Sequence, residues 1–190
     1  MPKIAIIHHS GYGHTRRMAE YVQQGASKTG AEVHFLTIDE HGDLPEAGWE
    51  TLAQADAIIF GAPTYMGGPS WQFKKFADAS SKPWFGQAWK DKFAAGFTNS
   101  ASMNGDKFST IQYFVTLAMQ HSMAWIGTGM MPANNKAATR DSINYVAGFT
   151  GALAASPSDA SPDEMFSGDL ATAEIFGERV ANFVAAHLKG

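Results

Sequence analysis

An isoleucine-rich apolar run, Lys3–His8, lies near the start of the chain and ends at the glycine-containing segment 10–13. Strands that are apolar on both faces are typical of the parallel sheets buried inside α/β proteins. A helix is predicted at residues 14–29, where apolar side chains recur at helical spacing and Gly30 ends the pattern. This strand–turn–helix unit predicts an α/β fold with a parallel sheet.

The same alternation continues along the chain. Further strands are predicted at residues 33–38, 57–61, 93–98 and 123–126, and further helices at 49–55, 70–79, 107–120 and 171–188. Residues 127–168 show no clear periodicity, which is typical of a functional or interfacial segment. Five strands suit a doubly wound, three-layer α/β/α fold with strand order 2-1-3-4-5, formed by residues 1–190 as a single domain.

Composition excludes several classes of function. The formal net charge is −4, which disfavours nucleic acid and anionic lipid as main partners. Cysteine is absent, so disulfides, thiolate metal sites and thiol nucleophiles are excluded. The N-terminal apolar run is too short for a signal peptide, and no run approaches the ~18 residues of a membrane span, so a cytoplasmic protein is expected.

Ligands of open α/β sheets bind beyond the carboxyl ends of the strands, where the strand order reverses. The first loop at this edge, residues 10–15, has the sequence Ser-Gly-Tyr-Gly-His-Thr. Its glycines permit a tight turn, and the N–H groups at the start of the next helix favour an anion such as a terminal phosphate. A plain strand-to-helix turn explains this loop equally well. It is neither a Walker loop nor a dinucleotide fingerprint.

Two more loops at this edge have unusual compositions. Residues 62–69, Ala-Pro-Thr-Tyr-Met-Gly-Gly-Pro, combine a rigid backbone with Tyr65 and Met66, which offer stacking surface for a planar ring. Residues 98–105, Thr-Asn-Ser-Ala-Ser-Met-Asn-Gly, could hydrogen-bond the edge of a heterocycle. Taken singly, the loops are equally consistent with a rigid turn and a plain polar loop.

Three histidines lie near the first loop: His8, His9 and His14. A metal site needs converging imidazoles, usually with a carboxylate. His8 and His9 point to opposite faces of a strand because side chains alternate there. No metal site is predicted.

Together the three loops resemble the WrbA group of flavodoxin-like NAD(P)H:quinone oxidoreductases. The most specific segments are Ser-Gly-Tyr-Gly-His at residues 10–14 and Gly-Ala-Pro-Thr-Tyr-Met-Gly at residues 61–67. Trp84 in Lys-Pro-Trp-Phe-Gly, His121 in Gln-His-Ser-Met and the segment Asn-Tyr-Val-Ala-Gly at residues 144–148 are also similar to that group. The resemblance covers nearly the whole chain and implies flavin mononucleotide (FMN) at the carboxyl edge of a flavodoxin-like sheet.

The resemblance also implies a role for each loop. The first loop would hold the FMN phosphate, the second would pack against the isoalloxazine, and the third would border its pyrimidine side and the ribityl chain. The implied FMN-binding residues are Ser10, Gly11, Tyr12, Gly13, His14, Thr15, Pro63, Thr64, Tyr65, Met66, Gly67, Thr98, Asn99, Ser100, Ala101, Met103, Asn104 and His121.

Three residues receive roles in the reaction from the same resemblance. Tyr12 would lie near the nicotinamide, Trp84 would cover the substrate, and His121 would reach the ring, with a position across a subunit boundary left open. His121 and Tyr12 are the candidates for assisting proton delivery. A structural tryptophan beneath a loop, and a histidine interacting with a helix dipole, are the alternatives for Trp84 and His121.

Two departures from the family pattern concern the pocket. The family's third loop is glycine-rich, whereas Ala101, Met103 and Asn104 replace most of those glycines here. Tyr65 stands where an arginine is usual. These changes bear on the shape of the pocket and on the choice of hydride donor and acceptor.

The implied activity is FMN-dependent transfer of hydride from NAD(P)H through flavin N5 to quinones or similar flat acceptors, with ping-pong kinetics. The resemblance also implies a homodimer or homotetramer with shared pockets. The main alternative is a flavodoxin-type electron carrier that docks to protein partners, which the modest net charge disfavours. A flavodoxin-like interaction protein without cofactor is a third hypothesis.

Overall fold

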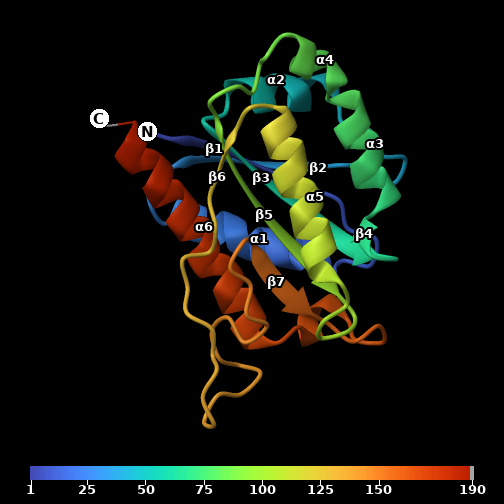
Figure 1. The fold of residues 1–190 in the computed structure, drawn as a ribbon, viewed down its shortest axis with the longest axis vertical. Coiled ribbons are helices and arrows are strands. Elements are labelled where there is room, and N and C mark those ends of the chain that lie inside the picture. The colour runs from blue at the N-terminus through green and yellow to red at the C-terminus, as the bar shows by residue number, and fades with distance from the viewer. Residues whose placement is uncertain (189–190) are drawn as a thin grey trace.

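The computed structural model describes residues 1–188, so the last two residues of the predicted domain lie outside it. Five main strands form the parallel sheet in the order β2-β1-β3-β5-β6, which confirms the predicted flavodoxin-like order (Figure 1). The numbering differs because a two-residue strand, β4, pairs antiparallel with the end of β3. The strands are β1 (Lys3–His8), β2 (Glu32–Thr37), β3 (Ala57–Tyr65), β4 (Gly68–Pro69), β5 (Phe93–Ser100), β6 (Ala124–Trp125) and β7 (Ala152–Ala155).

Helices cover both faces of the sheet and make the three layers seen in Figure 1. On one face, Ile4 and Ile6 of β1 belong to a core shared with α1 and α6. On the other face, Ala5 and Ile7 pack in a core with α2, α3 and α5. The helices are α1 (His14–Ser27), α2 (Glu46–Gln54), α3 (Trp71–Ala79), α4 (Ser81–Phe85), α5 (Lys107–Gln120), a short 3-10 helix (Pro162–Glu164) and α6 (Ser167–His187).

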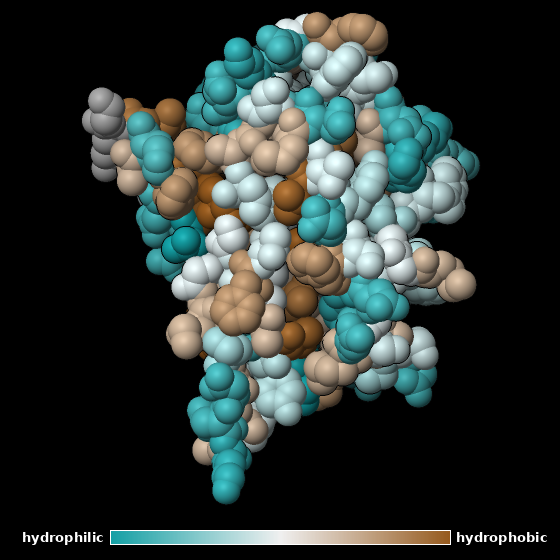
Figure 2. Space-filling model, in the orientation of Figure 1, coloured by the Kyte–Doolittle hydropathy of each residue, from teal (hydrophilic) through white to brown (hydrophobic). Residues whose placement is uncertain are grey.

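The fifth position of the sheet is shared by two separate strands. β6 pairs with Phe93 and Ala94 at the start of β5, whereas β7 pairs with residues 97–100 at its end. The chain between them leaves the sheet, and part of it projects as a hydrophilic loop at the lower end of the molecule (Figures 1 and 2). The aperiodic segment 127–168 therefore contains a strand and a 3-10 helix that its sequence did not predict.

Several element boundaries differ from the predicted ones for identifiable reasons. β3 and β5 continue into residues expected to be loops, because β4 and β7 supply partners for their last residues. α6 begins at Ser167, before the predicted residue 171, with Asp169 in its first turn, where an acidic side chain interacts favourably with the helix dipole. Residues Ser81–Phe85, for which no regular element was predicted, form the short helix α4.

Candidate functional site

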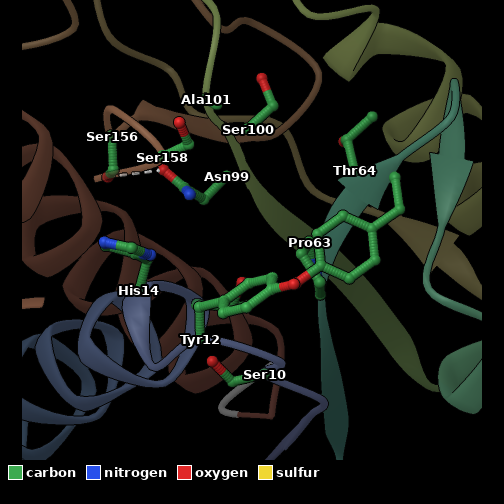
Figure 3. Close-up of a pocket in the computed structure, with 12 residues that line it drawn as sticks. Ser10, Tyr12, His14, Pro63, Thr64, Asn99, Ser100, Ala101, Ser156 and Ser158 are labelled. Carbon is green, nitrogen blue, oxygen red and sulfur yellow. Dashed lines mark hydrogen bonds between the residues drawn. The ribbon is translucent and has the colours of Figure 1, made fainter. Parts of the chain in front are cut away.

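A cavity of about 330 Å³ lies at the carboxyl ends of β1, β3 and β5 (Figure 3). This volume is at the lower end of the ~300–1,000 Å³ range of small-molecule sites. Segments far apart in the sequence meet here: the first, second and third predicted loops, and the segment that follows β7. The lining residues are Ser10, Tyr12, His14, Thr15, Pro63, Thr64, Tyr65, Asn99, Ser100, Ala101, Ser156 and Ser158.

The first loop forms one end of the cavity. Gly13 precedes α1 with φ of 93°, a left-handed conformation that favours glycine, and its N–H donates to Ser10 Oγ at 3.1 Å. A Cβ atom on Gly13 would lie 2.6 Å from Cγ of Pro162, so no side chain fits there. The first turn of α1 contains no acidic residue. Its N–H groups and the helix dipole therefore suit a phosphate.

Buried threonines hold the second and third loops together. The hydroxyl of Thr64 lies 2.8 Å from that of Thr98 and donates to that of Thr110 at 2.7 Å. Thr98 also donates to the carbonyl of Ala62 at 2.7 Å. Thr64 lines the cavity, but Thr98 is fully buried and its hydroxyl is engaged inside the protein. These bonds fix one wall of the cavity.

Aromatic side chains flank the cavity. Tyr12 extends from the first loop toward Pro63 (Figure 3), and its ring packs edge-on against Tyr65 with 6.2 Å between ring centroids. Tyr12 is 77% exposed and Tyr65 is 39% exposed. Partial burial, and to a lesser extent the neighbouring Tyr12, raise the pKa of Tyr65, so its hydroxyl stays neutral at physiological pH. A flat molecule can therefore stack on uncharged aromatic surface here.

The sequence missed one wall of the cavity. Ser156 and Ser158 follow β7, and Ser156 donates from its N–H to the carbonyl of Ser100 at 3.1 Å and from its hydroxyl to Asn99 Oδ1 at 2.9 Å. The available signal was the Ser-Pro-Ser segment at residues 156–158. It was uninformative in isolation because the preceding strand has only four residues.

The other predicted binding residues in the three loops do not line the cavity. Met66 is fully exposed, and Gly67 has no side chain and open space around it. Met103 and Asn104 lie on the exposed outer part of the third loop. Three further predicted residues do not line the cavity: Gly11, Gly13 and Thr98.

His121 and Trp84 lie at the opposite edge of the sheet. His121 follows α5 and precedes β6, which pairs with the start of β5. Its Nε2 atom is 2.9 Å from Ser80 Oγ, its ring packs on Trp89, and burial lowers its pKa to about 4. Trp84 donates from Nε1 to the carbonyl of Gln120 at 2.9 Å. Within one chain neither residue lines the cavity at the carboxyl edge, so their predicted roles require a second copy.

These two residues instead line a separate hollow of about 550 Å³ at the amino edge. Phe85, Met119 and Gln120 contribute to it. The hollow is open and mixed in polarity. The hollow lies beside α4, which is at the opposite end of the molecule from β7 in Figure 1.

The histidines near the first loop have separate environments. His9 Nδ1 lies 2.8 Å from Ser70 Oγ, and His14 Nε2 lies 2.8 Å from the carbonyl of Ala160. His8 is buried against Phe35. Residues 1–188 contain no group of three histidine or acidic side chains placed to hold a metal ion.

The fold and this cavity define a flavodoxin-like flavoprotein whose cofactor is FMN. The chain belongs to the NADPH-dependent FMN reductase family, whose model matches residues 2–138. In the part of the chain that the structure describes, no helix has the length and apolar character needed to cross a membrane.

Individual relatives carry two kinds of name. The chain is 49% identical to the flavodoxin FldP of Pseudomonas aeruginosa over 95% of this chain and 96% of that protein. It is 32% identical to an NAD(P)H dehydrogenase (quinone) of Geobacter sulfurreducens over 98% and 99% of the two chains. A WrbA-like flavodoxin structure from Agrobacterium tumefaciens superposes with a TM-score of 0.79 at 49% identity, covering 98% of this chain and 99% of that one.

Proposed function

We propose that this protein oxidises NAD(P)H and reduces quinones or similar flat acceptors in two separate encounters at the FMN cavity. The observation that carries the proposal is the cavity's open aromatic flank, where exposed Tyr12 faces Tyr65. Such surface suits stacking of a nicotinamide or a quinone ring. The full-length similarity to proteins named NAD(P)H dehydrogenase (quinone) supports the same activity.

Each part of the chain has a role in this proposal. The N–H groups at the start of α1, with the hydroxyls of Ser10 and Thr15, would bind the phosphate of FMN. Pro63, Thr64 and Asn99 would border the ring. The bound FMN supplies the two-electron chemistry that links the two substrates. Tyr12 would stack on the substrate and hold its ring in place, and its hydroxyl could assist proton delivery.

The proposal includes association of copies into a homodimer or homotetramer. Large apolar side chains are exposed on the amino-edge hollow, with Trp84 42% and Phe85 81% exposed. Figure 2 also shows apolar surface between α5 and α6. Contiguous apolar surface on a folded protein is typical of interfaces. In such an assembly the hollow that Trp84 and His121 line in one copy would face the FMN cavity of another. Each copy in this proposal is a single domain, residues 1–190, and the assembly is in the cytoplasm.

Steady-state kinetics of the FMN-loaded protein test the proposed activity. Initial rates are measured with NADPH or NADH against p-benzoquinone at several fixed concentrations of the other substrate. Because both substrates use the same cavity in turn, the double-reciprocal plots should be parallel, and either substrate in excess should inhibit. Intersecting lines would exclude a shared cavity. Absence of turnover with both nicotinamides would exclude the activity itself.

An electron carrier remains the second candidate, because one full-length relative at 49% identity is named a flavodoxin. Carriers steer to partners through a strong net charge, and this chain has only −4. Electron transfer to a redox protein that falls steeply with added salt, without NAD(P)H turnover, would favour the carrier. Weak salt dependence together with quinone turnover would favour the oxidoreductase.

A further inference from the structure

Lys107 is a buried cation beneath the third FMN loop. It is the first residue of α5 and is 1% exposed. Its Nζ atom donates to three consecutive backbone carbonyls, those of Ser102 at 2.5 Å, Met103 at 2.8 Å and Asn104 at 3.3 Å. A lysine with three donors is well matched to three converging acceptors. The loop therefore wraps around an ammonium group.

The backbone of the loop is shaped to make this wrapping possible. Gly105 and Asp106 both have left-handed conformations, with φ of 54° and 51°. A Cβ atom on Gly105 would lie 2.1 Å from Ser100 Oγ, which itself donates to the carbonyl of Ser102 at 3.0 Å. The loop consequently turns back on itself and aims its carbonyl groups inward.

Because these carbonyl groups point toward Lys107, the N–H groups of the same peptide bonds point the other way. All peptide bonds in the described chain are trans, so each N–H points away from the carbonyl that precedes it. The N–H groups of Met103, Asn104 and Gly105 therefore point away from Lys107. Within residues 1–188, none of these three N–H groups donates a hydrogen bond. The loop presents three free donors in a row, which follow Ala101, the last residue of this loop that lines the cavity.

The surroundings of Lys107 leave its side chain protonated at neutral pH. Burial lowers the pKa of Lys107 to about 8, with the nearby Asp169 opposing this effect and Arg140 adding to it. The side chain is therefore still protonated at neutral pH. Arg140 and Asp169 form a bidentate ion pair, so the charge of Lys107 is balanced by the carbonyl dipoles of the loop more than by a carboxylate of its own.

We propose that Lys107 is a positioning residue for FMN, which holds the third loop so that the N–H groups of Met103, Asn104 and Gly105 bind the acceptor edge of the flavin ring where the ring extends past Ala101, the last residue of this loop that lines the cavity. The family's third loop is glycine-rich. In this chain the loop has fewer glycines, and Lys107 fixes its shape. The inference rests on placing the flavin ring beside the third loop, as the proposed site does. It does not require NAD(P)H or quinone turnover.

The test is binding of FMN and of riboflavin to apoprotein carrying Lys107→Met, measured by quenching of flavin fluorescence. Riboflavin lacks the phosphate, so it reports on the ring side alone. Both dissociation constants should rise about tenfold or more, by similar factors, because the loss lies on the ring side. Lys107→Arg should recover part of the affinity. A change of less than about twofold for both ligands, or a loss confined to FMN, would overturn the proposal.

Lys92→Met is the matched control. Lys92 is less buried than Lys107, but it likewise donates from Nζ to backbone carbonyls, those of Ala53 and Ala55, at the opposite edge of the sheet. It should leave both dissociation constants unchanged. If it weakened flavin binding as much as Lys107→Met, loss of fold stability would explain both results and the proposal would fail.

A measurement on the unaltered protein covers the case in which Lys107→Met does not fold. Amide hydrogen exchange of Met103, Asn104 and Gly105 is followed by NMR with and without riboflavin. Exchange should slow markedly on binding, because the free donors become hydrogen-bonded. Unchanged exchange at all three residues in the riboflavin-saturated protein would contradict the proposal. A protein that protects these amides yet fails to oxidise NAD(P)H would sink the proposed activity and leave this inference standing.

Discussion

Gly13 shapes the proposed phosphate-binding end of the cavity, because its backbone conformation and its neighbour both exclude a side chain. Its φ of 93° is strained for any other residue, and a Cβ atom would lie 2.6 Å from Pro162. We predict that Gly13→Val abolishes FMN binding, since the loop must move away from the phosphate position. Equilibrium dialysis against FMN measures the effect.

Gly86→Ala is the control for that substitution. Gly86 lies at the end of α4, and the nearest atom to an added Cβ is 3.8 Å away. It should bind FMN like the unaltered protein. Retention of FMN by a folded Gly13→Val protein would contradict the assignment of the phosphate loop.

His8 makes the fold sensitive to acid. It is fully buried, neither ring nitrogen has a hydrogen bond of normal geometry, and burial lowers its pKa to about 4. Below about pH 6.5 His8 is protonated in the unfolded chain but stays neutral in the folded chain. The free energy of unfolding therefore falls as the pH drops toward 4. The full loss for one such group is roughly 3 kcal/mol.

We predict that His8→Leu flattens this acid dependence. The free energy of unfolding in urea is measured from about pH 7 to about pH 5, where the difference between the two proteins should grow as the pH falls. His121, whose pKa is also about 4, leaves part of the slope in place. Parallel curves for the two proteins would show that His8 is not the group responsible.

The sequence predicted ten of the individual residues that line the cavity, because strand-to-helix loops at the carboxyl edge have distinctive glycine, proline and hydroxyl patterns. It could not predict Ser156 or Lys107. Ser156 reaches Asn99 through a distant strand, and Lys107 is indistinguishable in sequence from a solvated lysine at the start of a helix. Both depend on contacts that only the folded chain creates.

The split fifth strand is the element that completes the cavity, and an ion pair secures it. Arg140, from the excursion between β6 and β7, makes a bidentate contact with Asp169 of α6, at 3.0 and 2.6 Å. Asp169 also accepts from the N–H of Ala155 in β7 at 2.9 Å. The guanidinium lies 4.1 Å from the centre of the Phe166 ring. One carboxylate thus connects three segments that meet beside the pocket.

We predict that Asp169→Ala lowers the free energy of unfolding by about 3 kcal/mol, because it leaves Arg140 without its buried partner. Urea denaturation measures the loss. Asp78→Ala removes the exposed partner of Lys74 on α3 and should cost less than about 1 kcal/mol. Equal effects of the two substitutions would show that the buried pair does not hold β7.

The regular elements could be predicted because their apolar patterns are local. The buried strands β1, β3 and β5 and the helix α5 lie where the sequence places them, with longer ends for β3 and β5. β7 could not be predicted, since Ala-Leu-Ala-Ala has no strand signature and is extended only by pairing with the end of β5. The path of the excursion is likewise set by Arg140, a long-range contact.

Two edges of the molecule carry the two halves of the proposed function. The carboxyl edge holds the proposed FMN cavity, and the amino edge holds the hollow with Trp84 and His121. Their separation within one chain makes the proposed assembly directly testable. The resemblance that suggested both residues near the flavin is compatible with this structure only when one copy contributes them to another.

We predict that the protein has a solution mass at least twice that of the 20.4 kDa chain, measured by light scattering after gel filtration. Phe85→Asp should shift it toward the monomer, because a charge replaces an exposed apolar ring beside Trp84. The variant should keep its fold, since Phe85 is 81% exposed. A monomer at micromolar concentration would exclude shared pockets and with them the proposed roles of Trp84 and His121.

The most direct test of the account is an anaerobic titration of the FMN-loaded protein with NADPH, and separately with NADH, followed at the visible absorption band of the flavin. The account predicts rapid bleaching at one equivalent of nicotinamide per flavin, and return of the band when a quinone is added. A flavin band that persists with both nicotinamides would contradict the proposed oxidoreductase and favour an electron carrier.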